Sequence, residues 1–366
     1  MTAAWRRRAL WALAAALALG VAGALGAASG VVSIRASGGH LAVVTWALKV
    51  SMRRSVAARA TDITAPPLDD PALVLEGAGQ YELACRACHG SPHLPTSRLA
   101  GSMLPPPPYL PRTVRAWSDA ELFEIVKHGI KFTGMPAWPS PRRDDEVWAM
   151  VAFLRALPAM SGPAYRDLVW ADGPPGEAAP TGPIGAQRPP VALARCGPCH
   201  GAAGEGRGPS AFPVLAGLDE RYLLASLDAF ARGARHSGVM QPVAAELDAA
   251  QRRALARYYA AQPRPAPPPA RDAASAARGE AIARRGVPGS RVPACAACHG
   301  PGGAPRNALY PTLAGQPAGY LARQLALFQQ GDRGGTAYAA VMTRAARGLS
   351  RAEMRDVAGY YASLGR

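Results

Sequence analysis

The sequence has few aromatic residues, and its cysteines are confined to one kind of site. Aromatic side chains make up 7% of the 366 residues, whereas glycine and proline number 39 and 36. Modules of about 80 to 95 residues with this composition bury little apolar surface by themselves. No residue set predicts hydrolytic or transferase catalysis. Acidic pairs such as Asp69/Asp70 and Asp144/Asp145 are typical of linkers and helix starts, because carboxylates stabilise helix N-termini. We therefore assign no catalytic residue and expect a bound group to complete the core.

All six cysteines lie in the pattern Cys-x-x-Cys-His, which occurs three times. Residues i, i+3 and i+4 of a helical turn share one face, so two thiols can add to two haem vinyl groups while the following imidazole meets the iron. A zinc knuckle needs a second ligand pair, and a thioredoxin-like dithiol needs a βαβ context. Neither these alternatives nor a disulfide framework explains a histidine after every second cysteine. The sequence therefore predicts three covalently bound haem c groups, whose buried porphyrins supply the missing core. The predicted sites are Cys85, Cys88 and His89; Cys196, Cys199 and His200; and Cys295, Cys298 and His299.

The N-terminus carries a separate signal. Arg6 to Arg8 precede an uncharged, Ala/Leu-rich run from Ala9 to Ile34. At about 1.5 Å per helical residue, this run can cross a hydrocarbon core of about 30 Å. The basic flank predicts a single membrane anchor with the haem domains on the outer side. The alternative is a cleaved signal peptide, because small residues such as Ala24 and Ala28 suit a cleavage site. Both interpretations place the haem domains outside the cytoplasm.

The segment from His40 to Pro67 combines apolar residues with a basic end at Arg53 and Arg54. This pattern is typical of a helix that rests on a membrane or on a partner subunit. An ordinary helix packed on the first haem domain fits equally well. The sequence leaves both interpretations open.

An internal repeat locates the remaining iron ligands. The block PVLAGLDERYLLASLDAF matches PTLAGQPAGYLARQLALF, which begins 98 positions later. Further along, the block that begins at Met240 matches the block that begins at Met342, and a Tyr-Tyr pair follows each methionine by eighteen positions. Met135 stands at the same distance before Phe153. We therefore expect Met135, Met240 and Met342 as the sixth iron ligands, and His/Met ligation raises the reduction potential relative to two nitrogen ligands.

Two questions remain open around these ligands. His128 and His236 lie close enough to methionines to replace them, although neither has a counterpart in the third module. Pro213 and Pro311 begin the two matched blocks, and a proline carbonyl can accept a bond from the other nitrogen of the axial imidazole. The alternative is that they are simple loop prolines.

The same blocks predict secondary structure. Each module should open with a helix that delivers the haem motif, form a middle helix after a proline-rich loop, present its methionine from a loop, and close with a helix. The expected middle helices are 115–128, 219–232 and 317–330, and the expected closing helices are 144–157, 248–261 and 350–364. Only residues 191–195 precede Cys196 after the linker, so the second module should have a short opening helix. The predicted fold class is all-α.

These modules resemble class I c-type cytochromes. The last two are similar to the halves of the dihaem cytochrome c-four group in YPTLAGQPAGYLARQLALF, VPACAACHGPGG and the Met-plus-Tyr-Tyr spacing. The first is similar to membrane-anchored bacterial monohaem domains in SVAARATDITAP and ELFEIVKHGIKFTGMPAW. The resemblance implies three tandem cytochrome c domains behind an N-terminal transmembrane helix. It also implies that the membrane is a bacterial inner membrane and that the haem domains lie in the periplasm. The expected boundaries are 1–65 for the anchor and juxtamembrane segment, 66–165 for domain 1, 166–190 for a Pro/Gly-rich linker, 191–262 for domain 2, 263–272 for a Pro-rich linker and 273–366 for domain 3.

The resemblance also implies electron transfer in a respiratory chain, with a terminal oxidase, a dehydrogenase or a quinol-oxidising complex as partner. The formal net charge of +16 predicts steering toward an acidic docking patch. Nucleic acid is not an expected partner, because the arginines are scattered without an aromatic-interleaved motif. Two alternatives stay open. One is the cytochrome subunit of a multi-subunit periplasmic alcohol or sugar-acid dehydrogenase, and the other is a haem peroxidase, which needs an iron with a displaceable ligand.

Overall fold

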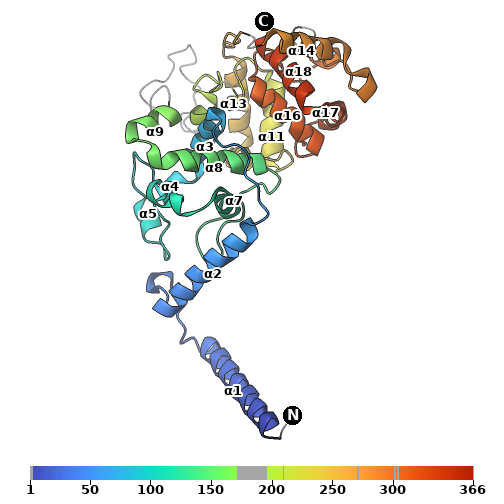
Figure 1. Ribbon diagram of the computed structural model, residues 1–366. Helices are drawn as coiled ribbons and strands as arrows, with labels where there is room; N and C mark the ends of the chain where they lie inside the picture. Colours follow the sequence, from blue (N-terminus) through green and yellow to red (C-terminus); the bar gives the residue numbers. More distant parts are fainter. Residues whose placement is uncertain are drawn as a thin grey trace.

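The computed structural model describes residues 3–170, 196–208, 210–269, 272–300, 302 and 305–365. Within these ranges every regular element is a helix, and β pairing is limited to an isolated bridge between Val287 and Val292. The all-α prediction is confirmed. Figure 1 shows a helical body from which α1 (Ala3–Ala28) projects toward the N-terminus, with η1 (Ala36–Gly38) and α2 (Ala42–Ala60) leading into the body.

The first module is built around two crossing helices, α3 (Pro71–Ala84) and α8 (Asp144–Ala156). Gly77 permits the close crossing, because a Cβ at this position would stand 2.2 Å from the carbonyl oxygen of Ala149. The core between the helices holds Tyr81 and Phe153, whose ring centroids are 5.1 Å apart. The other elements are α4 (Arg86–His89), α5 (Arg98–Gly101), α6 (Leu110–Thr113), η2 (Val114–Ala116), α7 (Asp119–His128), η3 (Leu157–Ala159) and α9 (Gly162–Val169).

The third module repeats this crossing with α14 (Ala273–Arg285) and α18 (Arg351–Ser363). A Cβ on Gly279 would stand 2.1 Å from the carbonyl oxygen of Asp356. The module also contains η4 (Pro288–Ser290), α15 (Ala296–His299), α16 (Ala318–Gln330) and α17 (Ala339–Ala346). The prediction that the opening helix delivers the haem motif directly is wrong here. Gly286, with φ of 69°, ends α14, and a bridged turn separates it from Cys295.

The second module is smaller. Residues 196–200 are helical, and α11 (Glu220–Ala231), α12 (Met240–Ala245) and α13 (Ala249–Ala260) follow. The predicted short opening segment, 191–195, lies outside the described residues, as does most of the linker 166–190. α3 of the first module packs on the haem motif of the second through an apolar cluster that includes Cys199, Phe212 and Leu75. A Cβ on Gly79 of α3 would stand 2.8 Å from the Cys199 sulfur. The first module therefore covers the second haem motif.

Polar caps determine where the middle and closing helices begin. Ser118, Asp248 and Ser350 each form a capping box at the start of α7, α13 and α18, which satisfies backbone N–H groups that have no partner within the helix. Gly129 ends α7 and Gly331 ends α16, both with positive φ. The predicted helix ranges are confirmed to within about one turn. The largest difference is at residue 115, because residues 114–116 form η2 and α7 starts only after Ser118.

Two of the three predicted methionine ligands lie on helices. Met240 is the first residue of α12, and Met342 lies inside α17, whereas Met135 is in the loop between α7 and α8. The prediction of loop methionines is therefore wrong for the second and third modules. These helices have only 6 and 8 residues, which is too short for a helical period to show in the sequence.

Buried carboxylates join the first module to the other two. Glu146 on α8 accepts hydrogen bonds from the Ser237 hydroxyl and the Gly238 N–H, both at 2.6 Å. Glu76 on α3 pairs with Arg323 on α16. Glu146 and Glu76 are only 3% and 5% exposed, so these contacts are buried inside one packed body.

Gln316 joins the second and third modules. Its side-chain amide donates to the Val214 carbonyl at 2.6 Å and accepts from the Val214 N–H at 3.1 Å. Arg264, within the Pro-rich linker 263–272, donates to the Ala314 carbonyl at 2.6 Å. The two repeats are therefore held together both directly and through their connecting segment.

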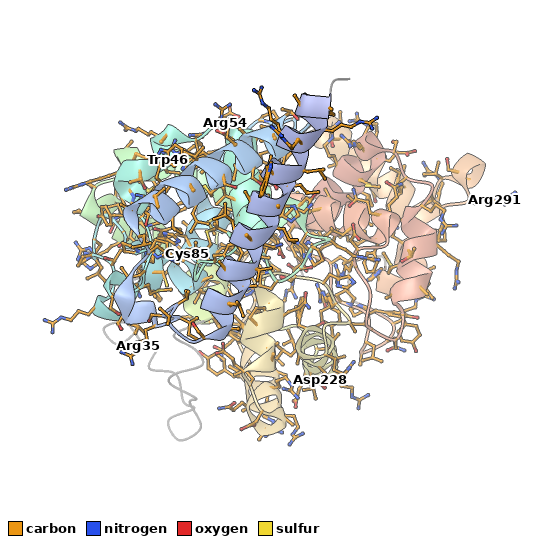
Figure 2. All side chains as sticks on the ribbon, turned by 90° about the horizontal axis from the view of Figure 1, so that it is seen from below. Arg35, Trp46, Arg54, Cys85, Asp228 and Arg291 are labelled. Atoms are coloured by element: carbon orange, nitrogen blue, oxygen red, sulfur yellow. The ribbon has the colours of Figure 1, made fainter. Side chains whose placement is uncertain are left out.

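α2 fits both earlier interpretations, each over one half of its length. Its C-terminal half packs on the first module, where Val56 and Ala60 are buried and the Arg53 guanidinium lies 5.1 Å from the centroid of the Trp117 ring. Its N-terminal half is open to solvent, and Trp46 is 65% exposed. Figure 2 looks from below onto the side of the body that carries α1 and α2, with Trp46 labelled on α2. By length and composition, α1 is apolar enough to cross a membrane.

Candidate haem sites

Each Cys-x-x-Cys-His motif forms one helical turn. The His89 N–H bonds to the Cys85 carbonyl and the His299 N–H bonds to the Cys295 carbonyl, both at 2.9 Å. In the second motif residues 196–200 are also helical. The two cysteines and the histidine of each motif therefore share one helix face, as the spacing predicted.

A proline carbonyl orients the imidazole at all three motifs. The Nδ1–O distance is 2.9 Å from His89 to Pro108, 3.3 Å from His200 to Pro213 and 3.0 Å from His299 to Pro311. Because a carbonyl oxygen can only accept, Nδ1 carries the proton and Nε2 keeps its lone pair for a metal. The interpretation of Pro213 and Pro311 as imidazole partners is confirmed. The sequence reasoning missed Pro108, which could have been found from the run of prolines that ends just before Tyr109.

Burial keeps these imidazoles neutral. It lowers the pKa of His200 to about 4, against the opposing effect of the bond to Pro213. Burial also lowers the pKa of His89 and of His299. A neutral imidazole with a free Nε2 is the form that ligates iron, so the sites are prepared for axial coordination.

The cysteine environments differ from those of reactive dithiols. Burial raises the pKa of Cys85 and of Cys199 to about 12 and that of Cys295 to about 11. Catalytic dithiols and zinc thiolates have lowered pKa values. In the part of the chain that the structure describes, no three His, Cys, Asp or Glu side chains gather into a metal site of their own. The raised thiol pKa values favour covalent haem attachment over the zinc and thioredoxin alternatives.

A glycine with positive φ follows each motif, at Gly90, Gly201 and Gly300, with φ of 69°, 77° and 76°. This region of φ favours glycine. A Cβ on Gly90 would also stand 2.6 Å from the Tyr109 ring. The chain can therefore turn away from the histidine at once and return to place the proline carbonyl beside the ring.

One cavity of ≈ 370 Å³ connects the second and third sites. Both cysteine pairs, both motif histidines and both predicted methionines of these two modules line it. Apolar side chains provide most of the remaining wall, including Leu223 and Leu321 at equivalent positions of the repeat. The residues present therefore fit two haems: thiols for attachment, an oriented imidazole and a thioether for each iron, and an apolar enclosure.

The first site does not share this cavity, whose lining includes none of the residues of the first haem motif. Cys85 packs against the core of the first module, and His89 is half-buried next to Pro108. Met135 lies in a loop whose backbone is fixed by bonds from the Ile130 N–H to the Met135 carbonyl and from the Met135 N–H to the Thr133 hydroxyl. The assignment of Met135 to the iron of His89 stays a prediction from sequence spacing.

The two competing histidines have different surroundings. His128 is exposed and lies 3.6 Å from Glu124 on the preceding turn, which favours a surface role. His236 is half-buried and lines the same cavity as Met240. Both His236 and Met240 therefore lie near the second site. Met240 stays the predicted ligand, because only Met240 has a counterpart in the third module.

Two protein families match the chain. The family described as cytochrome c oxidase, cbb3-type, subunit III matches residues 72–154, and the family described as cytochrome c matches residues 276–365. These ranges contain the first and third motifs.

Curated relatives and solved structures match about half of the chain. A thiosulfate dehydrogenase electron acceptor from Thiomonas intermedia is 41% identical over 179 residues, which is 49% of this chain and 82% of that protein. A cytochrome c4 from Pseudomonas aeruginosa is 35% identical over 170 residues, which is 46% of this chain and 83% of that protein. The crystal structure of reduced cytochrome c4 from Pseudomonas stutzeri is 31% identical and covers 49% of this chain and 100% of that chain, with a TM-score of 0.45.

Proposed function

This chain belongs to the class I c-type cytochromes, and from that membership we propose that it binds three haems and carries electrons between redox proteins at the outer face of a bacterial inner membrane. Electron transfer and covalently bound haem c follow from the family. The proposal adds the number of haems, the ligands of each iron, the three-domain division and the membrane tether. The proposed axial pairs are His89 with Met135, His200 with Met240, and His299 with Met342.

The middle motif supports the count of three. Neither matched family range includes it, yet its geometry agrees with the other two. His200 is 9% exposed and contacts the Pro213 carbonyl through Nδ1, and its cysteines line the apolar cavity. A motif without a haem would have no reason to keep an imidazole buried, neutral and oriented.

The proposed ligands favour an electron carrier over a peroxidase. When bound, haem iron supplies reversible one-electron chemistry. The proline carbonyls fix the imidazoles and raise their basicity as ligands, and the methionine thioethers raise the reduction potential. A histidine and a methionine would hold each iron, and this ligand set would leave no open position for peroxide or oxygen. The apolar walls exclude water from the site, so the surroundings rearrange little when the charge changes.

Mass analysis of the exported protein tests the count. We expect three bound haems in the wild type and two in a variant with Cys196→Ala and Cys199→Ala. Fewer than three haems in the wild type contradicts the proposal. The ligands are tested by replacing Met135, Met240 and Met342 with alanine one at a time. Each variant should lose the methionine-to-iron absorption band of one haem, whereas Met160→Ala should keep all of them.

The membrane tether is supported by α1 and by the exposed apolar half of α2. We propose that α1 is retained and that the haem domains are held at the periplasmic surface. The intact mass of the purified mature protein tests this. A mass that includes residues 3–28, together with recovery in the membrane fraction, is expected. A mature N-terminus after Ala28 with release into the soluble fraction would show that the segment is a signal peptide.

A second candidate function concerns the electron donor. Relatives named thiosulfate dehydrogenase electron acceptor favour a dehydrogenase as the partner, which is one of the three partner classes expected from the resemblance. Rapid mixing of the oxidised protein with thiosulfate dehydrogenase and thiosulfate should reduce the haems faster than thiosulfate alone. Equal rates with and without the enzyme would exclude this donor and leave the carrier function standing.

A further inference from the structure

Two arginines occupy equivalent positions in the second and third modules. Arg235 follows α11 and Arg333 follows α16, and they lie 98 positions apart in the repeat. Each guanidinium carbon lies 4.5 Å from the centroid of the phenylalanine ring on its own helix, Phe230 for Arg235 and Phe328 for Arg333. The fold therefore holds both guanidiniums in the same way, as expected for positions with the same task.

The two arginine loops meet where the modules meet. A Cβ on Gly335, which has φ of 80°, would stand 2.8 Å from the Arg235 backbone nitrogen. Arg235 and Arg333 both line the cavity that contains the second and third haem motifs. Burial lowers the pKa of Arg333, and the charge of Arg235 lowers it further. Two like charges are thus held close together at the wall of an apolar cavity.

No carboxylate of the chain compensates this charge in the described ranges. The ion pairs found there include neither Arg235 nor Arg333. The two carboxylates that line the cavity belong to Glu76, which pairs with Arg323, and to Glu146, which has four donors of its own. Arg235 is only 8% exposed and Arg333 is partly buried. A cation in an apolar cavity is destabilising without an anion, so the cavity favours an anionic occupant at this point.

Neutral groups around the pair complete a polar pocket for an anion. Arg333 donates to the Tyr222 hydroxyl at 3.1 Å and to the Gln324 amide oxygen. Burial opposes ionisation of Tyr222, but the two guanidiniums lower its pKa to about 8. The field around this pair is therefore positive enough to favour negative charge even on a phenol.

We propose that Arg235 and Arg333 form a clasp for the propionate carboxylates of the second and third haems, and so hold the carboxylate edges of both groups at the interface between the two modules. This inference rests on the proposed function, because it requires haem at both motifs. Guanidinium groups bind carboxylates through paired N–H donors. The clasp compensates the two cations, fixes the two haems relative to each other and sets their potentials.

Haem-resolved redox titration of Arg333→Gln and Arg235→Gln tests the clasp. Loss of a cation leaves propionate charge uncompensated, which stabilises the ferric form. We expect a tenfold fall in the reduction equilibrium constant of the second or third haem, equivalent to about 59 mV for one electron, and no change at the first haem. Arg351→Gln, at the exposed start of α18, is the matched control. Potentials that match this control, or equal shifts at all three haems, would overturn the clasp.

Two further measurements keep the outcome clear. Haem is counted by mass in every variant, so a wild type with fewer than three haems refutes the proposed function, whereas three haems with unshifted potentials refute only the clasp. If a glutamine variant does not fold, Arg333→Lys and Arg235→Lys are titrated instead, because lysine keeps the charge but loses the paired N–H donors of the guanidinium. We expect a smaller shift in potential of the same sign, and an unchanged potential would overturn the proposal. Titration with and without inorganic phosphate tests for a free anion. Wild-type potentials that follow phosphate, and a loss of that response in Arg333→Gln, would assign the pocket to a free anion and not to propionates.

Discussion

Glu146 offers the sharpest test of how the first module is held. Its carboxylate accepts from the Ser237 hydroxyl and the Gly238 N–H at 2.6 Å, from the Trp138 indole N–H at 3.1 Å and from Arg143 at 2.9 Å. Each of its two oxygens therefore faces two donors. Glu146→Gln keeps the shape of the side chain but turns one oxygen into an NH2 group that must face two donors.

The cost follows from this count. Two hydrogen bonds are lost, and each buried donor left without an acceptor costs about 1–3 kcal/mol. Severing a buried ion pair completely costs about 3–5 kcal/mol, but Arg143 keeps its two bonds to Asp145 at 2.8 and 2.9 Å. We therefore expect Glu146→Gln to lower the free energy of unfolding by about 2–4 kcal/mol.

Urea unfolding of the haem-loaded chain measures this loss. Circular dichroism and tryptophan fluorescence should give coincident transitions in the wild type. In Glu146→Gln they should separate, because the first module undocks before the others unfold. Glu280→Gln is the control, since Glu280 forms only an exposed pair with Arg284 within α14, and such pairs contribute about 0.3–0.5 kcal/mol. Equal midpoints for the two variants would refute the assigned role of Glu146.

Three further predictions concern packing, pH and the membrane. Gly77→Ala should destabilise the first module by about 1–3 kcal/mol or more through overpacking, as measured by thermal unfolding, whereas Gly101→Ala, where a Cβ meets nothing within 4 Å, should not. Burial opposes ionisation of Asp145, but its arginine partner Arg143 holds the pKa of the carboxyl below the ordinary 3.8. The carboxylate therefore stabilises the fold above that value, and this contribution is lost as the pH falls through the lower folded pKa. In acid denaturation, the difference in stability between wild type and Asp145→Asn should shrink below about pH 4. A chain that lacks residues 1–34 should still bind anionic vesicles in a flotation assay, and Trp46→Ser should weaken that binding; unchanged flotation would show that α2 has no contact with lipid.

Local features of the fold could be predicted from the sequence because they depend on short spacings. Ser118 and Ser350 cap helices that begin near the predicted positions. Pro213 and Pro311 contact the imidazoles because the repeat places them at nearly the same separation from each motif, 13 residues after His200 and 12 after His299. Arg235 and Arg333 are also related by the 98-residue offset of the repeat. The sequence does not show that both line one cavity, and that shared position is what suggests a role for their charges.

The contacts between modules could not be predicted in this way. Glu146 and Ser237 belong to different modules, and no repeat or period links them in the sequence. The packing of Gly79 on Cys199 could not be predicted either, because a glycine within a helix does not indicate which neighbour approaches it. The alignment of the two repeats identifies Met240 as the equivalent of Met342, but the six-residue helix that carries Met240 is too short to give a helical pattern in the sequence. Docking geometry depends on surface complementarity between folded modules, and single-sequence periodicity does not encode that.

The cover that α3 forms over the second motif imposes an order on biogenesis. The Cys199 side chain is 6% exposed and lies beneath Gly79, which belongs to a module that emerges earlier from the ribosome. Porphyrin and the ligation machinery must reach this sulfur while it is still accessible. The first domain to be synthesised can therefore dock on the second motif only after the later segment that contains Cys199 has received its porphyrin.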